Sequence, residues 1–184
     1  MSAGCGYEEG AAVLVEPIGK VQQREVTAAT EHYRQQAQDI YKRRFTPVPV
    51  LFDLAGRTAG MFKLVGRRGW IRYNPWIFAK YFEENLRDTV PHEVAHFIVY
   101  ELYGTRGIKP HGRQWRAVME HFGADQGVTF DLELECVPQR QQRTHPYRCG
   151  CRLHEVSSTR HNRVQLGVGS YRCRLCGSDL AYVG

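Results

Sequence analysis

Residues 92–96 have the types and the spacing of a metal-dependent hydrolytic site. His92, Glu93 and His96 form the pattern H-E-x-x-H. Side chains four residues apart lie on one face of a helix, so both imidazoles can bind the same metal ion. Glu93 is rotated away from the metal axis, and it suits a general base that takes a proton from a metal-activated water better than it suits a ligand. The pattern predicts a zinc site with hydrolytic chemistry.

A catalytic zinc site needs three protein ligands and one open position, and His111 is the best candidate for the third ligand. It follows a short loop and precedes residues 112–122, whose apolar side chains have helical spacing: Trp115, Val118, Met119 and Phe122. Two helices joined in this way would fold His111 back over the first helix. The alternative is that the two helical histidines are ordinary helix residues and that His111 caps a loop. The position of Glu93 favours metal binding.

The H-E-x-x-H segment is predicted to lie in a helix over residues 89–104. Pro91 is tolerated near its start because first-turn amides have no partner within the helix, and Thr89 or Asp88 can cap that end. Gly104 can adopt the left-handed conformation that ends a helix. The helix therefore has both a start signal and a stop signal, and its other faces are apolar.

The segments before this helix predict another helix and a small sheet. Residues 21–45 have an amphipathic helical pattern, 46–54 form a short proline-bounded strand, and 59–73 form a hairpin. A further helix is expected from Pro75 to Leu86. This order of elements is an α+β fold. One strand of the 59–73 hairpin is a candidate for binding an extended substrate by strand addition, and the alternative is a plain sheet strand.

Cysteines gather in two short knuckles in the C-terminal segment. Cys149 and Cys151 form a C-x-C pattern, and Cys173 and Cys176 form a C-x-x-C pattern. Two facing knuckles make a zinc ribbon, in which a metal ion replaces a hydrophobic core that so few residues cannot build. Because C-x-C is tighter than the usual C-x-x-C, the first knuckle can use Cys149 with Cys151, or Cys151 with His154. We take the four cysteines as the ligands of a structural zinc and His154 as the substitute.

The net charge of +6 lies in the C-terminal segment. Residues 139–184 contain eight arginines and two acidic residues, whereas residues 1–138 hold seventeen basic and seventeen acidic side chains. Guanidinium groups neutralise phosphate and flat rings stack on unpaired bases, so this segment is predicted to bind nucleic acid, either DNA or RNA. DNA with single-stranded character is the partner that we expect. The alternatives are a solubilising or a protein-docking basic face. The arginines expected to contact nucleic acid are Arg148, Arg152, Arg160, Arg163, Arg172 and Arg174.

The composition is that of an ordinary globular protein. The 184 residues include no run of eighteen apolar residues, and the first ten are small and acidic rather than basic and apolar. We therefore expect a cytoplasmic location and no membrane partner. A chain of this length can hold one catalytic domain and a small appendage.

Two sets of motifs resemble one protein family. The chain resembles the SprT family of zinc metallopeptidases in Val-Pro-His-Glu-Val-Ala-His-Phe, in the following Tyr-Gly and in Pro-His-Gly-Arg-Gln-Trp. It resembles the zinc ribbon of that family in Tyr-Arg-Cys-Gly-Cys and Tyr-Arg-Cys-Arg-Leu-Cys-Gly. The similarity extends over about residues 25–182 and points to the bacterial branch that carries a ribbon. It implies a zincin-like fold in which His92, His96 and His111 bind the catalytic zinc and Glu93 is the catalytic acid and base.

The resemblance also implies a substrate class. Relatives of the Spartan type cleave proteins crosslinked to DNA, so DNA-associated proteins are the expected substrates. One rival function is a zinc-stabilised nucleic-acid-binding or regulatory factor with a silent peptidase site, and another is a hydrolase of non-protein substrates. The expected organisation is a flexible arm over 1–20, a metallopeptidase domain over 21–136, a linker over 137–146 and a zinc ribbon over 147–184.

Overall fold

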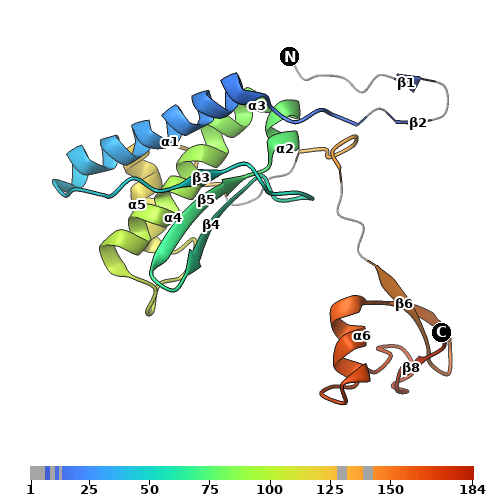
Figure 1. The fold of residues 1–184 in the computed structure, drawn as a ribbon. Helices are drawn as coiled ribbons and strands as arrows, with labels where there is room; N and C mark the ends of the chain where they lie inside the picture. Colours follow the sequence, from blue (N-terminus) through green and yellow to red (C-terminus); the bar gives the residue numbers. More distant parts are fainter. Residues whose placement is uncertain (1–6, 9–10, 13, 128–131, 139–142) are drawn as a thin grey trace. The chain divides into compact units, whose positions relative to one another are not determined.

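The structure is a computed structural model, and it describes residues 7–8, 11–12, 14–127, 132–138 and 143–184. The chain divides into two compact units, residues 1–139 and residues 140–184. In the described residues, each unit combines helical structure with a small three-stranded sheet, which confirms the predicted α+β class (Figure 1).

The first unit contains a three-stranded sheet in the order β3-β5-β4. β3 (Val50–Leu51) runs parallel to β5 (Arg68–Tyr73), and β4 (Gly60–Val65) pairs with β5 in the antiparallel sense. β4 therefore lies at one edge of this sheet. The strand predicted over residues 46–54 is only two residues long, because Pro47 and Pro49 have no N–H to donate to a neighbouring strand.

Helices cover this sheet on the side of the H-E-x-x-H segment. α1 (Lys20–Tyr41) ends at Lys42, which has the left-handed conformation with φ of 50°. α4 (Val90–Tyr103) carries the motif and packs against α1, α5 (Arg113–Phe122) and both strands of the hairpin (Figure 1). The α4 side chains that face the core are fully buried, among them Val90, Val94, Ala95 and Ile98. α4 is thus held on several sides by apolar contacts.

The segment that leads into α4 differs from the single helix predicted from Pro75 to Leu86. It forms α2 (Pro75–Lys80), α3 (Phe82–Glu84) and a π-helical turn, η1 (Asn85–Thr89). Asn74 caps α2, since its side-chain oxygen accepts hydrogen bonds from the N–H groups of the second and third helical residues. The predicted start of the catalytic helix at residue 89 is one residue early, because η1 continues directly into α4.

Buried polar side chains connect this interrupted segment internally. Asn85 is fully buried, and its amide donates to the backbone carbonyls of Ile77 and Tyr81. The Thr89 hydroxyl donates to the Asn85 side-chain oxygen at 2.7 Å. These bonds give the buried side chains of Asn85 and Thr89 their hydrogen-bond partners.

Part of the segment predicted as a flexible arm is attached to the folded unit. Val15 donates its N–H to the Cys136 carbonyl, and Ile18 donates to the Pro75 carbonyl and is 3% exposed. Farther towards the N-terminus, β1 (Tyr7–Glu8) and β2 (Ala11–Ala12) form a two-residue antiparallel pair. Residues 1–6, 9–10 and 13 of the predicted arm lie outside the described residues.

The second unit is a three-stranded antiparallel sheet with one helix. Its order is β7-β6-β8, from β7 (Leu153–Ser157), β6 (Thr144–Arg148) and β8 (Ala181–Tyr182). β6 begins inside the segment predicted as a linker. α6 (Ser158–Gln165) was not predicted, because its sequence is polar and has no apolar stripe. Among the helices of the described residues, none combines the length and the apolar character needed to cross a membrane.

Candidate active site and metal centres

Three histidine side chains meet beside α4 in the first unit. The Nε2 atom of His96 lies 3.2 Å from Nε2 of His92 and 3.1 Å from Nε2 of His111. The Nε2 atoms of His111 and His92 are 3.1 Å apart. His92 and His96 come from successive turns of α4, and His111 comes from the loop that leads into α5. The structure therefore brings together the three histidines that the sequence selected.

This triangle of nitrogens fits a metal ion better than a hydrogen-bond network. A hydrogen bond needs one donor and one acceptor, and among three nitrogens at least two have the same role. At least one of the three short contacts therefore cannot be a hydrogen bond. Three nitrogens bound at about 2.05 Å to a tetrahedral zinc lie roughly 3.3 Å apart, close to the observed separations. The donor set is a facial group of three imidazoles that could hold a metal ion.

Trp115 of α5 forms the floor under the three imidazoles. It is fully buried, and its ring centroid lies 4.7 Å from that of His92, 5.7 Å from that of His96 and 4.8 Å from that of His111. Its indole N–H donates to the His92 carbonyl at 3.3 Å. Sequence analysis placed Trp115 only on the apolar face of a helix. Its contact with all three histidines depends on the α4–α5 crossing, which no local pattern reveals.

Burial keeps the three imidazoles neutral, which is the form that binds metal. Desolvation, followed by repulsion from the neighbouring histidines, lowers the pKa of His92 to about 4 and that of His96 to about 3. Desolvation also lowers the pKa of His111. The Gly127 backbone opposes the shift at His92 through a hydrogen bond. Such an outer partner orients a metal-binding imidazole.

Glu93 lies under the edge of the sheet, next to the histidines. It is 6% exposed, and its Oε2 atom accepts a hydrogen bond of 2.6 Å from the N–H of Phe62 in β4. Burial raises the pKa of Glu93 to about 7, and the Phe62 hydrogen bond opposes that shift. The carboxylate is therefore fixed by the strand, as well as by its own helix.

Gly60 makes room for this carboxylate. A Cβ atom at Gly60 would lie 2.7 Å from Cγ of Glu93 and 2.7 Å from Cγ2 of Thr89, closer than carbon atoms approach each other. Only glycine allows β4 to cross α4 at this distance. Sequence analysis did not identify Gly60 or Phe62 as site residues. A glycine inside a strand does indicate a close approach of another element, and that signal was available.

The outer edge of β4 presents peptide groups beside the histidines. Ile71 of β5 donates its N–H to Pro49 on the β3 side, and Phe62 is the β4 residue opposite Ile71. That pair is therefore a non-hydrogen-bonded pair, and the Phe62 peptide groups point away from β5. By the two-residue period of a strand, the same holds for Gly60 and Leu64. β4 is thus the hairpin strand whose edge can receive an extended chain.

Comparison with known proteins places this site in a family. The model of the SprT-like family matches residues 30–137, which include the whole histidine site. The chain belongs to the SprT-like family. It is similar to Protein SprT from Vibrio parahaemolyticus, with 39% identity over 150 residues that cover 80% of this chain and 86% of the relative. It is also similar to the Protein SprT chains of Serratia proteamaculans (36% identity, 80% of this chain and 84% of the relative) and Actinobacillus succinogenes (35% identity, 79% and 82%).

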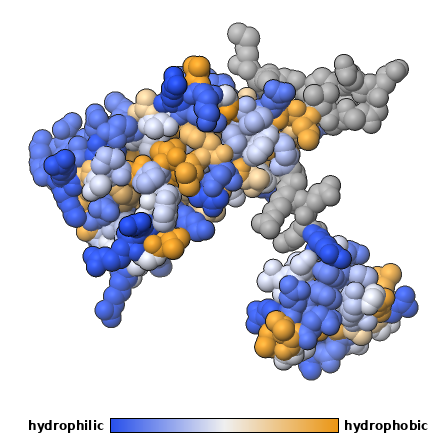
Figure 2. Space-filling view, in the orientation of Figure 1, coloured by the Kyte–Doolittle hydropathy of each residue, from blue (hydrophilic) through white to orange (hydrophobic). Residues whose placement is uncertain are grey.

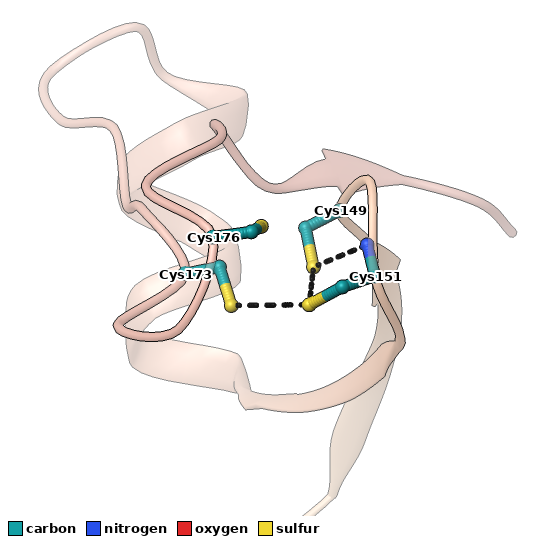
Figure 3. A group of neighbouring side chains, drawn as sticks. All are labelled: Cys149, Cys151, Cys173 and Cys176. Atoms are coloured by element: carbon teal, nitrogen blue, oxygen red, sulfur yellow. Dashed lines mark hydrogen bonds between the residues drawn. The ribbon is translucent and has the colours of Figure 1, made fainter.

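The second unit of this SprT-like chain holds a group of four cysteines (Figure 3). The Sγ atom of Cys151 lies 3.4 Å from that of Cys149 and 3.7 Å from that of Cys173, and Cys176 completes the group, whose sulfur atoms all lie within 4.8 Å of one another. Sulfur atoms at about 2.3 Å from a tetrahedral zinc are roughly 3.8 Å apart. The four thiols therefore fit one closed tetrahedral site.

His154 lies beside this group rather than in it. Its Nε2 atom is 3.1 Å from Sγ of Cys149. The sequence left open whether the first knuckle uses Cys149 or His154 together with Cys151. The structure groups Cys149 with the other three cysteines and places His154 against the outer side of that sulfur, where an imidazole N–H can donate to a thiolate.

Hydrogen bonds prepare the second knuckle for the thiolate form that binds metal. The Ser178 side chain and backbone lower the pKa of Cys176 to about 6. Backbone N–H groups of Cys176 and Leu175 lower the pKa of Cys173. Hydrogen bonds with the other thiols, Cys149 first, raise the pKa of Cys151 in the metal-free group. The tight turn around Gly177, with φ of 70°, supplies these N–H groups.

The six arginines chosen from the sequence do not share one face of the second unit. Tyr147 of β6 is buried, and its hydroxyl contacts His161 of α6 at 3.1 Å, so the next residue, Arg148, points to the opposite face of the sheet. Arg160 and Arg163 project from α6, and Arg160 lies over the Tyr171 ring at 5.5 Å. Hydrophilic residues cover most of the visible face of this unit (Figure 2).

The other three arginines lie near the cysteine knuckles. Arg152 follows Cys151, Arg174 lies between the cysteines of the second knuckle, and both are exposed. Arg172 is exposed and forms an ion pair with Asp179 at 2.9 Å. The group on α6, together with Tyr171, is therefore the part of the predicted surface that combines neighbouring positive charge with an aromatic ring.

Proposed function

We propose that this SprT-like protein is a cytoplasmic zinc-dependent endopeptidase that acts on DNA-associated or DNA-crosslinked proteins. The observation that carries the peptidase proposal is the convergence of three Nε2 atoms within 3.2 Å of one another, with the Glu93 carboxylate on the same helix as two of them. This combination of three neutral ligands and a separate carboxylate is the donor set of a zinc hydrolase.

The roles of the side chains follow from their contacts. A zinc ion held by the three imidazoles would supply a Lewis acid that activates water and polarises the scissile carbonyl. Glu93 takes the proton of the attacking water and later gives it to the nitrogen of the leaving amine. Because Oε2 accepts the N–H of Phe62, Oε1 is the oxygen available to carry that proton. Trp115 keeps the imidazoles oriented and excludes water from beneath them.

The edge of β4 supports a polypeptide as the substrate. An extended chain can add to an open strand edge through main-chain hydrogen bonds, and the outward-facing peptide groups of Gly60 and Leu64 flank the position of Glu93. A hydrolase of small non-protein substrates would have no use for such an edge. This supports an endopeptidase over that rival.

We further propose that residues 140–184 form a zinc ribbon that binds nucleic acid. The four converging thiols support one structural zinc, so that the whole chain holds two zinc ions of different kinds. The excess of arginine supports binding to phosphate, with Arg160, Arg163 and Tyr171 at the centre of the surface. Binding to DNA would raise the local concentration of DNA-bound substrates near the peptidase site by tethering.

The peptidase proposal is tested by comparing two substitutions in the full chain. Glu93→Gln removes the proton acceptor but no ligand, and we expect it to retain both zinc ions and to lose about 10²–10⁴-fold in cleavage of an unfolded protein substrate. His96→Ala removes a ligand, and we expect it to lose one zinc ion as well as activity. If Glu93→Gln cleaved proteins as fast as the unchanged chain, the rival of a binding factor with a silent site would be favoured.

The nucleic-acid proposal is tested with charge reversal on α6. We expect Arg160→Glu with Arg163→Glu to weaken binding to a labelled single-stranded oligonucleotide and to reduce the salt dependence by roughly 0.7 for each lost phosphate contact. Arg172→Glu is the matched control, since Arg172 already pairs with Asp179. Cleavage of a DNA-crosslinked protein should fall in the double variant, while cleavage of the same protein without DNA should not. Equal binding by the unchanged chain, the double variant and Arg172→Glu would contradict a role of α6 in binding nucleic acid.

A further inference from the structure

The active-site cleft has an apolar recess on one side of Glu93. A cavity of about 410 Å³ opens beside His96 and His111, a size that accommodates one or two large side chains. Its walls come from three different segments: Leu64 of β4, Val99 and Tyr100 of α4, and Ile108 and Pro110 of the loop before α5. These five side chains are aliphatic or aromatic.

The other side of Glu93 has a different chemistry. A second recess, of about 530 Å³, shares only Gly60, His92 and Glu93 with the first. Besides Glu93, its lining contains five charged side chains: Arg57, Glu84, Arg87, Asp88 and Asp125. The two recesses meet at the residues that would hold the scissile bond, so the two flanks of a bound chain would meet unlike surroundings.

Contacts between the walls hold the apolar recess open. The Phe62 ring lies 5.9 Å from the Phe97 ring and 5.9 Å from the Tyr100 ring, which joins β4 to α4. The Tyr100 hydroxyl also donates to the Arg67 carbonyl at the tip of the hairpin, at 3.4 Å. Val99 is only 4% exposed and is part of the core. The recess is therefore built into the fold and needs no rearrangement to receive a side chain.

We propose that this recess is the specificity pocket of the enzyme and selects substrates with a large apolar side chain on one side of the scissile bond. The proposal rests on the proposed peptidase function. An extended chain on the β4 edge would direct alternate side chains towards α4, as Phe62 and Leu64 themselves do. One such side chain would enter the apolar recess. The charged recess on the other side of Glu93 would not select for an apolar side chain. This preference also directs cleavage to unfolded segments, since large apolar residues are buried in folded proteins.

The size of the preference can be bounded. One methylene in a hydrophobic enzyme pocket changes kcat/KM by about 10–200-fold. A leucine or phenylalanine offers several methylene equivalents, but an open cleft uses only part of them. We therefore expect at least a tenfold higher kcat/KM for leucine or phenylalanine than for aspartate at the position that meets the recess.

The first experiment measures cleavage positions without assuming the substrate. The zinc-loaded full chain is incubated with a mixture of peptides of diverse sequence, and mass spectrometry identifies the residues on each side of every cleaved bond. The expected result is enrichment of leucine, phenylalanine and methionine at one position on one side only. Cleavage without enrichment, or with equal enrichment on both sides, would overturn the pocket assignment while leaving the peptidase proposal intact.

The second experiment reverses the chemistry of the pocket. Leu64→Glu should shift the enriched position towards lysine and arginine, and Leu64→Lys should shift it towards aspartate and glutamate, because opposite charges attract inside the recess. Val65→Glu is the matched control: it is the next residue of β4, is 58% exposed and does not line the recess. Opposite shifts in the two Leu64 variants cannot result from general damage to the fold.

A milder variant tests the size of the recess, and a binding assay tests the recess separately from cleavage. Leu64→Ala enlarges the recess without adding charge and should shift the preference from leucine towards phenylalanine and tryptophan. Peptide affinity is measured separately on Glu93→Gln, which should bind but not cleave, with leucine and aspartate versions of one fluorescent peptide. If no wild-type preparation cleaves any peptide and the leucine version binds no better, both the peptidase proposal and the pocket fail. If the wild-type chain cleaves no peptide but Glu93→Gln binds the leucine version better, the peptidase proposal fails. The recess then remains a binding site for apolar side chains.

Discussion

The histidine site and the cysteine group lie in units with very different hydrophobic cores. The three histidines sit on a fully buried tryptophan within a continuous apolar core that joins helices and sheet. In residues 143–184, by contrast, the buried apolar side chains are Tyr147, Cys149, Val156 and Cys173, and two of these four belong to the cysteine group. The first unit can therefore fold around its own core, whereas the second unit lacks a comparable one. A metal ion would add chemistry to the first fold, whereas in the second it would replace a hydrophobic core.

The two sites also differ in the number of ligands and in whether a coordination position is left open. The histidine site offers three potential ligands, and the Glu93 carboxylate lies beside them without being one of the three. The cysteine site has four ligands and fits a closed tetrahedron. An open site suits catalysis because water and substrate need a coordination position. A closed site suits structure because nothing has to leave or enter.

The largest expected effect is loss of the second fold when one cysteine ligand is removed. Structural zinc contributes about 10–16 kcal/mol of apparent binding free energy to small domains, so Cys173→Ser in the full chain should unfold residues 143–184 and leave the first unit folded. Amide NMR spectra of the full chain distinguish the two units. His154→Ala is the matched control, since His154 contacts Cys149 from outside the group. Unfolding by His154→Ala and not by Cys149→Ser would mean that the imidazole is the ligand.

An intermediate effect is expected for the floor of the histidine site. Trp115→Ala should cost about 3–5 kcal/mol of unfolding free energy, because it leaves a large cavity in the core. It should also weaken zinc binding at the histidine site by about 10–100-fold, since the imidazoles lose their support. Denaturant unfolding and zinc titration measure the two effects. Phe122→Ala, on the same helix and packed against Tyr33, should lower stability without the loss of zinc affinity.

Much of the histidine site and of the cysteine group could be predicted, because the signals of both are local in sequence. The spacing of His92 and His96, the turn before His111 and the two cysteine knuckles each need only a few neighbouring residues. The roles of Trp115 and Phe62 depend on how helices and strands cross, and no short pattern contains that information. The same reason explains the arginines: their number is a property of the sequence, but their division between two faces of a sheet is set by strand pairing.

The elements missed in the fold have equally specific causes. The helix α6 contains two arginines, a histidine and an asparagine, and it is held by contacts of His161 with Tyr147 and with the ring of His145 at 3.7 Å rather than by an apolar stripe. The π turn before α4 depends on the buried Asn85, whose two partners lie four and eight residues earlier. Such polar contacts carry little signal in a hydrophobic pattern.

A smaller effect is expected at Gly60, where the chemistry should change without the metal. In Gly60→Ala the new methyl group would displace the Glu93 side chain, and a displacement of about 1 Å at a catalytic group costs about 10²-fold in rate. We expect kcat to fall by that order while zinc content and the folding of the second unit are unchanged. Gly19→Ala is the control, because a Cβ atom there meets nothing within 4 Å. Full activity in Gly60→Ala would show that the position of Glu93 is not critical.

The most direct measurement of the two-site account is the number of zinc ions in matched chains and the order in which they leave. Elemental analysis should give two zinc ions per wild-type chain, one in His96→Ala and one in Cys173→Ser. A chelator added to the wild-type chain should remove the zinc of the open histidine site first and abolish peptidase activity before the amide signals of residues 143–184 change. A single zinc ion in the wild-type chain that persists in His96→Ala would contradict the catalytic metal site, and one that persists in Cys173→Ser would contradict the ribbon.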